Sequence, residues 1–228
     1  DIKYKLKKIT SQKKISVKIG NDVVFSEKNL PIIAGPNGVE GRKMIFTVAK
    51  FLKKQGIKIL RGHAYKPLTF PYRSKTYKES MEQGMEWLDE VKRHLGMKIV
   101  TEVTEIKYLD KINHTADILQ IGSRNMQNLE LLKECALTKK PIILKRHFGA
   151  SLRDMLGAAE HILVENNNKL IFLKTHNALC KINGYSFTDT KNSLGAVHII
   201  RDPRNVISSI SNHYQIDLDE ALKFMKTP

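Results

Sequence analysis

Cationic and polar side chains follow a series of apolar runs along the chain, and they carry the first indication of chemistry. Between residues 30 and 146 the runs are followed by Asn37, by Arg61 with Lys66, by Glu102, by Gln120 with Arg124, and by Lys145 with Arg146. Arginine suits bidentate contact with phosphate or carboxylate. If these side chains meet at one rim, five cations and a carboxylate form a site for a polyanion. A single charged residue after an apolar run is usually a solvated surface charge. Because charged or polar residues follow four successive runs, the anion-binding site is the favoured interpretation.

The elements that would position these side chains alternate regularly from residue 30 onward. Short apolar runs alternate with helical patterns near 41–55, 78–95, 105–113, 126–137 and 151–166, with a sixth run at 169–174. This alternation is typical of a parallel sheet with crossover helices. The runs are apolar almost throughout, as strands buried on both faces should be. The predicted fold class is α/β, a barrel or doubly wound sheet of five or six βα units, with reactive groups at the carboxyl ends of the strands.

Composition limits the function classes. The chain has 228 residues, 41% hydrophobic content and a formal net charge of +16, so phosphorylated metabolites, nucleic acid and an anionic membrane surface are all candidate partners. The basic residues are spread along the whole chain and aromatics make up 7%, which disfavours sequence-specific nucleic-acid binding. No run approaches the ~20 apolar residues of a membrane span, and two cysteines favour a reduced, cytoplasmic protein with no membrane partner.

The pattern changes at both ends of this alternating region. Residues 1–28 form an N-terminal extension, in which the basic opening is interpreted as a solvated strand or loop. After residue 175 the chain becomes polar and turn-rich, and one more apolar run, "GAVHII", precedes "RDPRNVISSISNHY" and a helix expected near 217–226. The predicted organisation is therefore the extension, a partial barrel over 29–168, and a separate segment over 169–228.

Five motifs resemble the 3-deoxy-7-phosphoheptulonate (DAHP) synthase family. They are "IIAGPNGVEG", "ILRGHAYKPLTFPY", "KIVTEVTE", "ILQIGSRNMQNLELLKE" and "PIILKR". The resemblance implies a TIM-type (βα)8 barrel that condenses phosphoenolpyruvate with erythrose 4-phosphate, the entry to the shikimate pathway and aromatic amino acid biosynthesis. It implies that Arg61, Lys66, Arg124 and Lys145 hold phosphoenolpyruvate, and that Lys66, the catalytic candidate, and Thr69 meet the aldose phosphate. The pattern of strand ends adds Glu102 and Arg146 to the substrate-binding candidates.

Three departures from that family pattern are visible. Leu68 replaces an arginine for the sugar phosphate in "KPRT", and Asn37 replaces the cysteine that ligates metal in the metal-dependent members. The related 3-deoxy-octulosonate 8-phosphate synthases include metal-independent members with asparagine there, so no metal or cofactor is assigned. The runs of the last two strands, of the types "DPSHATG" and "IEVH", do not appear. An incomplete barrel with impaired condensation is expected, and a homo-oligomer is left open.

The segment 169–228 resembles an inner part of the sulfotransferases that use 3'-phosphoadenylyl sulfate (PAPS), which belong to the P-loop NTPase-like folds. The likeness is carried by "FLKTHNA" and "VHIIRDPRNVISSISNHY". It implies His176 as the base and Arg201 with Ser209 as ligands of the 3'-phosphate of PAPS. A turn with a helix start at Pro203 is the simpler interpretation of "RDPR", and a "PKSGTTW"-type loop does not occur in the chain. A fusion, a fragment and a chimera all fit this pattern. The hypotheses are a condensing transferase, a sulfotransferase and a non-catalytic phosphometabolite-binding module.

Overall fold

The computed structural model describes residues 16–26, 29–65, 80–165, 171–174, 181–182, 185–186 and 216–226. Their central feature is a six-stranded parallel sheet. Its strands are β3 (Ile33–Ala34), β4 (Ile59–Arg61), β5 (Lys98–Val103), β6 (Ile118–Ile121), β7 (Ile142–Lys145) and β8 (Ile171–Lys174). Neighbours in the sheet are also neighbours in the chain. This order is that of a TIM-type barrel rather than a doubly wound sheet, in which the strand order reverses. The six strands thus form a parallel half-barrel.

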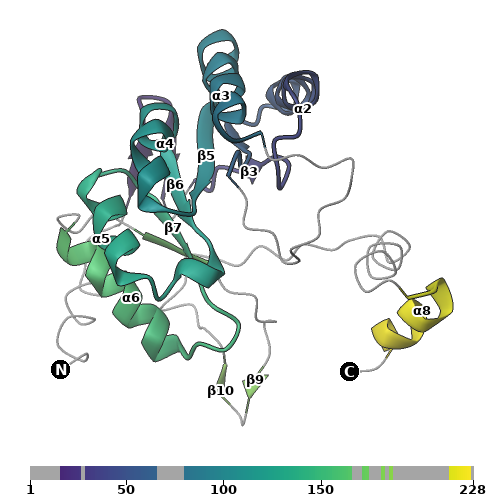
Figure 1. Ribbon diagram of the computed structural model, residues 1–228, viewed down its shortest axis with the longest axis vertical. Coiled ribbons are helices and arrows are strands. Elements are labelled where there is room, and N and C mark those ends of the chain that lie inside the picture. The colour runs from purple at the N-terminus through teal and green to yellow at the C-terminus, as the bar shows by residue number, and fades with distance from the viewer. Residues whose placement is uncertain are drawn as a thin grey trace. The chain divides into compact units, whose positions relative to one another are not determined.

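Helices follow the strands in chain order along the sheet (Figure 1). They are α2 (Arg42–Lys54), α3 (Met81–Leu95), α4 (Leu109–Thr115), α5 (Leu129–Leu137) and α6 (Leu152–Glu165), with the 3-10 turns η1 (Ile106–Tyr108) and η2 (Ser123–Asn125). Alternate apolar residues of β4 to β7, such as Leu60, Ile99 and Leu119, pack with buried helix residues in the larger apolar cluster. The predicted helices are therefore confirmed within a few residues of their expected ends.

The opposite sheet face carries a smaller apolar cluster, and the N-terminal segment covers it. Strands β1 (Val17–Ile19) and β2 (Val23–Phe25) pair as an antiparallel hairpin. Its four buried apolar side chains pack with one inward residue from each of five strands: Ile33, Ile59, Val100, Ile118 and Ile143. The interpretation as a solvated strand or loop concerns the basic opening, residues 1–14, which lies outside the described residues. The hairpin that follows is buried on one side, because Val17, Ile19, Val23 and Phe25 cover the apolar layer of the sheet.

Burial in this layer predicts a large cost of truncation. Ile118 is completely buried, so Ile118→Ala is expected to lower the free energy of unfolding by about 2 to 5 kcal/mol. Ile32 is the matched control, because it is 63% exposed and Ile32→Ala should change that free energy by less than about 0.5 kcal/mol. Urea unfolding of both variants measures the difference, and equal midpoints would contradict the described packing.

The chain divides into two compact units. The first spans Asp1–Phe187, and β8 pairs in parallel with β7 inside it. The domain boundary expected at residue 168 stays a prediction. The second unit spans Thr188–Pro228. Two short antiparallel strands, β9 (Lys181–Ile182) and β10 (Tyr185–Ser186), end the first unit.

One helix, α8 (Leu218–Lys226), is described in the second unit, where the sequence predicted it. Its start is capped by Asp217, whose Oδ1 accepts a hydrogen bond from the Glu220 backbone N–H at 2.7 Å. Within the described ranges, no helix combines the length and apolar character needed to cross a membrane.

Candidate functional site

The inward face of the sheet becomes polar toward the carboxyl ends of the strands. In each of four strands, a polar or charged residue follows the residue of the inward apolar layer by two positions. These residues are Arg61 in β4, Glu102 in β5, Gln120 in β6 and Lys145 in β7. Side chains of a strand alternate between faces, so each of these residues lies on the same side as the apolar residue before it. Glu102 and Gln120 are direct register partners. The structure thus collects at one rim the strand-end residues that the sequence singled out from β4 to β7.

Glu102 lies at the centre of this group. Its side chain is 10% exposed, and its Oε2 accepts a hydrogen bond from Gln120 Nε2 at 2.9 Å. Burial raises the pKa of Glu102, while Lys145, the Gln120 bond, Arg61 and Arg124 lower it in part. Burial also disfavours the charged form of Lys145 and so lowers its pKa, whereas the charge of Glu102 raises it. Three cations from β4, η2 and β7 therefore act on one buried carboxylate.

Arg61 is held by two neutral acceptors. Its Nε donates to His63 Nε2 and its Nη2 donates to Asn37 Oδ1, both at 3.0 Å. His63 is 1% exposed, and its Nε2 lies 3.3 Å from Gln120 Nε2. Burial lowers the pKa of Arg61 and Glu102 raises it. The guanidinium is therefore oriented by its neighbours without a carboxylate bonded directly to it among the residues described here.

Two glycines allow the backbone to approach the site closely. A Cβ on Gly122 would lie 2.0 Å from Glu102 Oε1. Gly35 has a φ of +148°, and a Cβ there would lie 2.0 Å from the Arg61 carbonyl oxygen. At Gly35 the obstacle is main chain, so the loop after β3 depends on glycine to approach Arg61. At Gly122 the obstacle is the Glu102 carboxylate, which would have to leave its present position.

The other predicted site residues divide into two groups. Arg124 lies in η2 and is exposed, and Arg146 directly follows Lys145 and is half-buried. The role of Arg146 stays a prediction. Outside the described residues lie Lys66, Thr69, His176, Arg201 and Ser209.

His63 is the site residue that the sequence analysis missed. It follows Arg61 by two positions, which is the spacing that keeps two side chains on one side of an extended segment. That spacing was the available signal. It is weak, because His63 lies beyond the end of β4 and two of its neighbours, Gln120 and Glu102, come from other strands.

The surroundings of Asn37 do not fit a divalent metal ion. Its Oδ1 accepts from the Arg61 guanidinium, so the amide oxygen faces a cation. A neutral amide is also a poor replacement for a thiolate on a soft divalent ion. In the parts of the chain that the structure describes, no three His, Cys, Asp or Glu side chains group as metal ligands.

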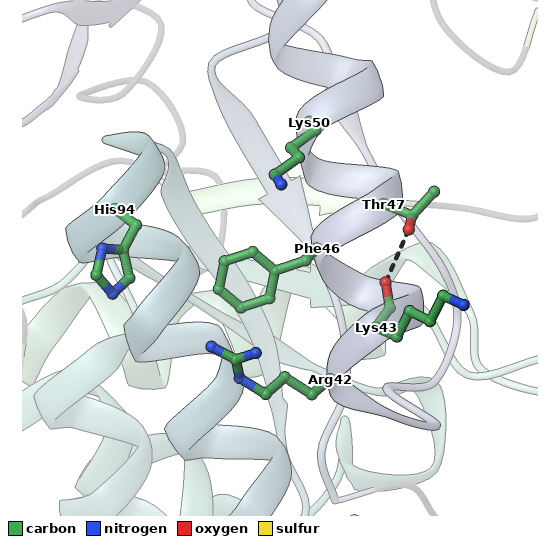
Figure 2. Close-up of a pocket in the computed structure, with 6 residues that line it drawn as sticks. All are labelled: Arg42, Lys43, Phe46, Thr47, Lys50 and His94. Carbon is green, nitrogen blue, oxygen red and sulfur yellow. Dashed lines mark hydrogen bonds between the residues drawn. The ribbon is translucent and has the colours of Figure 1, made fainter.

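A separate hollow of about 610 Å³ lies between α2 and α3 (Figure 2). Its lining comes from Arg42, Lys43, Phe46, Thr47 and Lys50 of α2 and from His94 of α3. Arg42 is paired there with Glu90, with 2.6 Å between Nη2 and Oε2, and lies over the Phe46 ring. None of the strand-end residues lines this hollow, so it is distinct from the candidate site.

Comparison with known proteins places the chain in a family. Residues 7–207 match the DAHP synthetase I family. The chain belongs to this family. The match continues past residue 168, into the segment whose sequence resembles an inner part of the sulfotransferases. That assignment stays a prediction.

Named relatives of this DAHP synthetase I family member come from several bacteria. A phospho-2-dehydro-3-deoxyheptonate aldolase of Thermotoga maritima is 42% identical over 188 residues, 81% of this chain and 51% of the relative. A 2-dehydro-3-deoxyphosphooctonate aldolase of Campylobacter jejuni subsp. doylei is 32% identical over 52% of this chain and 46% of the relative. The chain thus spans about half the length of these relatives.

The fold of the family member agrees with solved structures. The crystal structure of the Thermotoga maritima phospho-2-dehydro-3-deoxyheptonate aldolase (DAHP synthase) matches with a TM-score of 0.64 at 41% identity, covering 70% of this chain and 45% of that one. A truncated form of 3-deoxy-D-arabino-heptulosonate 7-phosphate synthase from the same organism matches with a TM-score of 0.60 at 37% identity. It covers 73% of this chain and 60% of that one.

Proposed function

We propose that the strand-end site binds phosphoenolpyruvate and that the chain serves its condensation with erythrose 4-phosphate. The observation that carries the proposal is the convergence of Arg61, Arg124 and Lys145 on the buried Glu102. Phosphoenolpyruvate presents a phosphate and a carboxylate, which repel each other and need several fixed cations. Cations held in place before the ligand arrives are the main electrostatic device available for such chemistry.

The choice of erythrose 4-phosphate as second substrate rests on the relatives. The Thermotoga relative, whose name refers to a heptonate product, is 42% identical, against 32% for the Campylobacter relative named for an octonate product. Lys66 and Thr69 are proposed to meet the aldose phosphate, with Lys66 as the catalytic residue. Leu68 stands between them and cannot contact phosphate, so weak affinity for the aldose phosphate is part of the proposal.

Lys145 provides the first test. Lys145→Met keeps an unbranched side chain and removes the cation, so the Kd for phosphoenolpyruvate should rise about tenfold, as expected for losing one hydrogen bond to a charged group. Isothermal titration calorimetry measures the change. Lys43→Met is the matched control, because Lys43 is an exposed lysine of α2 and its loss should leave the Kd within about twofold.

The outcomes separate the hypotheses. Failure of the unmodified chain to bind phosphoenolpyruvate, or equal affinity of the Lys145→Met and Lys43→Met variants, would remove the site assignment. Binding without consumption of phosphoenolpyruvate in the presence of erythrose 4-phosphate would favour the non-catalytic phosphometabolite-binding module. The sulfotransferase hypothesis predicts binding of adenosine 3',5'-bisphosphate that weakens in Arg201→Ala.

A further inference from the structure

His63 is a buried imidazole at the centre of the site, on a closely held stretch of backbone. Its carbonyl oxygen accepts from the Val39 N–H at 3.0 Å, and the preceding Gly62 N–H donates to the Val100 carbonyl at 3.0 Å. A Cβ on Gly62 would lie 2.9 Å from Val39 Cγ2. The main chain on both sides of the imidazole is thus fixed by β5 and by the loop that carries Asn37.

The contacts of His63 determine which of its ring nitrogens carries a proton. Arg61 Nε has one hydrogen and no lone pair, so its 3.0 Å contact requires His63 Nε2 to accept. The Gln120 amide nitrogen, 3.3 Å from the same atom, has two hydrogens and gives one to Glu102. Both neighbours of Nε2 are therefore donors. If Nε2 accepts from Arg61, His63 is neutral with its proton on Nδ1, and its 3.7 Å approach to Glu102 Oε2 is then not an ion pair.

The neutral state matters for the charge of Arg61. The guanidinium donates one hydrogen bond from Nε to His63 and another from Nη2 to Asn37. Two hydrogen bonds from different nitrogens fix the plane of the group. Neither acceptor is charged. The nearby carboxylate oxygen Glu102 Oε2 is engaged by Gln120 instead. Arg61 is therefore oriented while its positive charge stays available to an anion.

We propose that His63, as the neutral tautomer protonated on Nδ1, is a positioning residue that aims the Arg61 guanidinium at the phosphate or carboxylate of the bound anion. This inference rests on the proposed function, because it assigns His63 a role in phosphoenolpyruvate binding. A histidine that only fills the core would not require a lone pair on Nε2.

Nitrogen NMR of the free protein tests the tautomer without any ligand. The full chain, labelled with ¹⁵N at its eight histidines, is compared with the His63→Gln variant to identify the His63 signals. The expected result is a proton on Nδ1 and a lone pair on Nε2. The two states are distinguished by the ¹⁵N chemical shift, which differs strongly between an unprotonated and a protonated ring nitrogen. A proton on Nε2 would overturn the proposal.

Two variants test the positioning. In His63→Gln the side-chain oxygen reaches about as far as Nε2 and can accept from Arg61, whereas His63→Leu offers no acceptor. We expect His63→Gln to keep the Kd for phosphoenolpyruvate within about threefold and His63→Leu to raise it about tenfold. Circular dichroism checks that each variant is folded. Equal affinities of the two variants would overturn the role of His63.

A double-mutant cycle separates positioning from general support of the fold. If His63 acts through Arg61, His63→Leu should have no further effect on the Kd once Arg61→Ala is present. A full additional tenfold loss in that background would show that His63 acts on the site by another route. Failure of the unmodified chain to bind phosphoenolpyruvate would instead remove the proposed function, so the two failures are distinguishable.

Discussion

Gly35→Ala is expected to lower the free energy of unfolding by about 3 to 5 kcal/mol, because over-packing costs about 1 to 3 kcal/mol and a strained backbone adds about 1 to 3 kcal/mol. The added Cβ would lie 2.0 Å from the Arg61 carbonyl oxygen and 2.9 Å from the Arg61 backbone nitrogen. These are main-chain atoms of β4, so no side chain can turn away to make room. The φ of +148° adds strain of its own, because L-residues rarely adopt it.

The same substitution should also damage the site. β3 pairs with β4 through Ala34 and Leu60, and Asn37 follows two residues after Gly35. Moving β3 away from β4 would separate Asn37 from Arg61, so phosphoenolpyruvate affinity should fall together with stability.

Gly157→Ala is the matched control for Gly35→Ala. Gly157 lies inside α6, and a Cβ there would meet nothing within 4 Å. Alanine favours helix over glycine, so this variant should gain about 0.5 to 1 kcal/mol. Chemical unfolding of both variants gives the comparison. A Gly35→Ala protein as stable as the unmodified chain would contradict the described approach of β3 to β4.

Much of the fold follows from local patterns, because each strand of the half-barrel is a short continuous apolar run. β4 to β7 lie inside the predicted runs, and α3 ends at Leu95, directly before Gly96, which has the left-handed conformation that glycine favours. Arg61, Glu102 and Lys145 were predicted as a group for a related reason. Parallel strands in one sheet end at one rim, so the last residues of successive runs must come close together.

The contacts that the sequence could not predict all depend on distant partners. His63 and Gln120 are 57 positions apart and meet because β4, β5 and β6 are adjacent. The hairpin of β1 and β2 has Lys18 between Val17 and Ile19, which alone resembles a solvated strand. Its burial requires the apolar layer of strands that come later in the chain. Periodicity reports which face of an element is apolar, but not what covers it.

The second large effect is expected from Glu102→Gln, which should bind phosphoenolpyruvate about ten- to a hundredfold more tightly. Glutamine can still accept the hydrogen bond from Gln120, so the change mainly removes a negative charge beside the bound anion. Two unit charges about 5 Å apart interact by roughly 3 kcal/mol at an effective dielectric constant of ~20. Solvent screening reduces this interaction energy to about 1.4 to 2.8 kcal/mol, which corresponds to the ten- to hundredfold change in Kd. Burial already raises the pKa of Glu102, so its charge is unfavourable even with three cations nearby.

The dependence of this effect on pH has a definite sign. Protonation removes the charge of Glu102 as glutamine does, so the two proteins should bind equally well below the pKa of the folded-state carboxyl. The ratio of their Kd values should grow as the pH rises through that pKa, which lies above the ordinary value of 4.5. Comparing the two proteins at each pH cancels the titration of phosphoenolpyruvate itself.

Glu105→Gln is the control that separates local from general charge. It removes one negative charge from a residue whose side chain is 54% exposed and paired with Lys107, so its effect on the Kd should stay below about twofold. Calorimetric titrations across the pH range compare the three proteins. Weaker binding by Glu102→Gln than by the unmodified chain, or a ratio independent of pH, would show that Glu102 holds the cations in place for the ligand. The predicted tightening requires the other case, in which Arg61 and Lys145 are positioned by the sheet and by His63, and Glu102 competes with the anion for their charge.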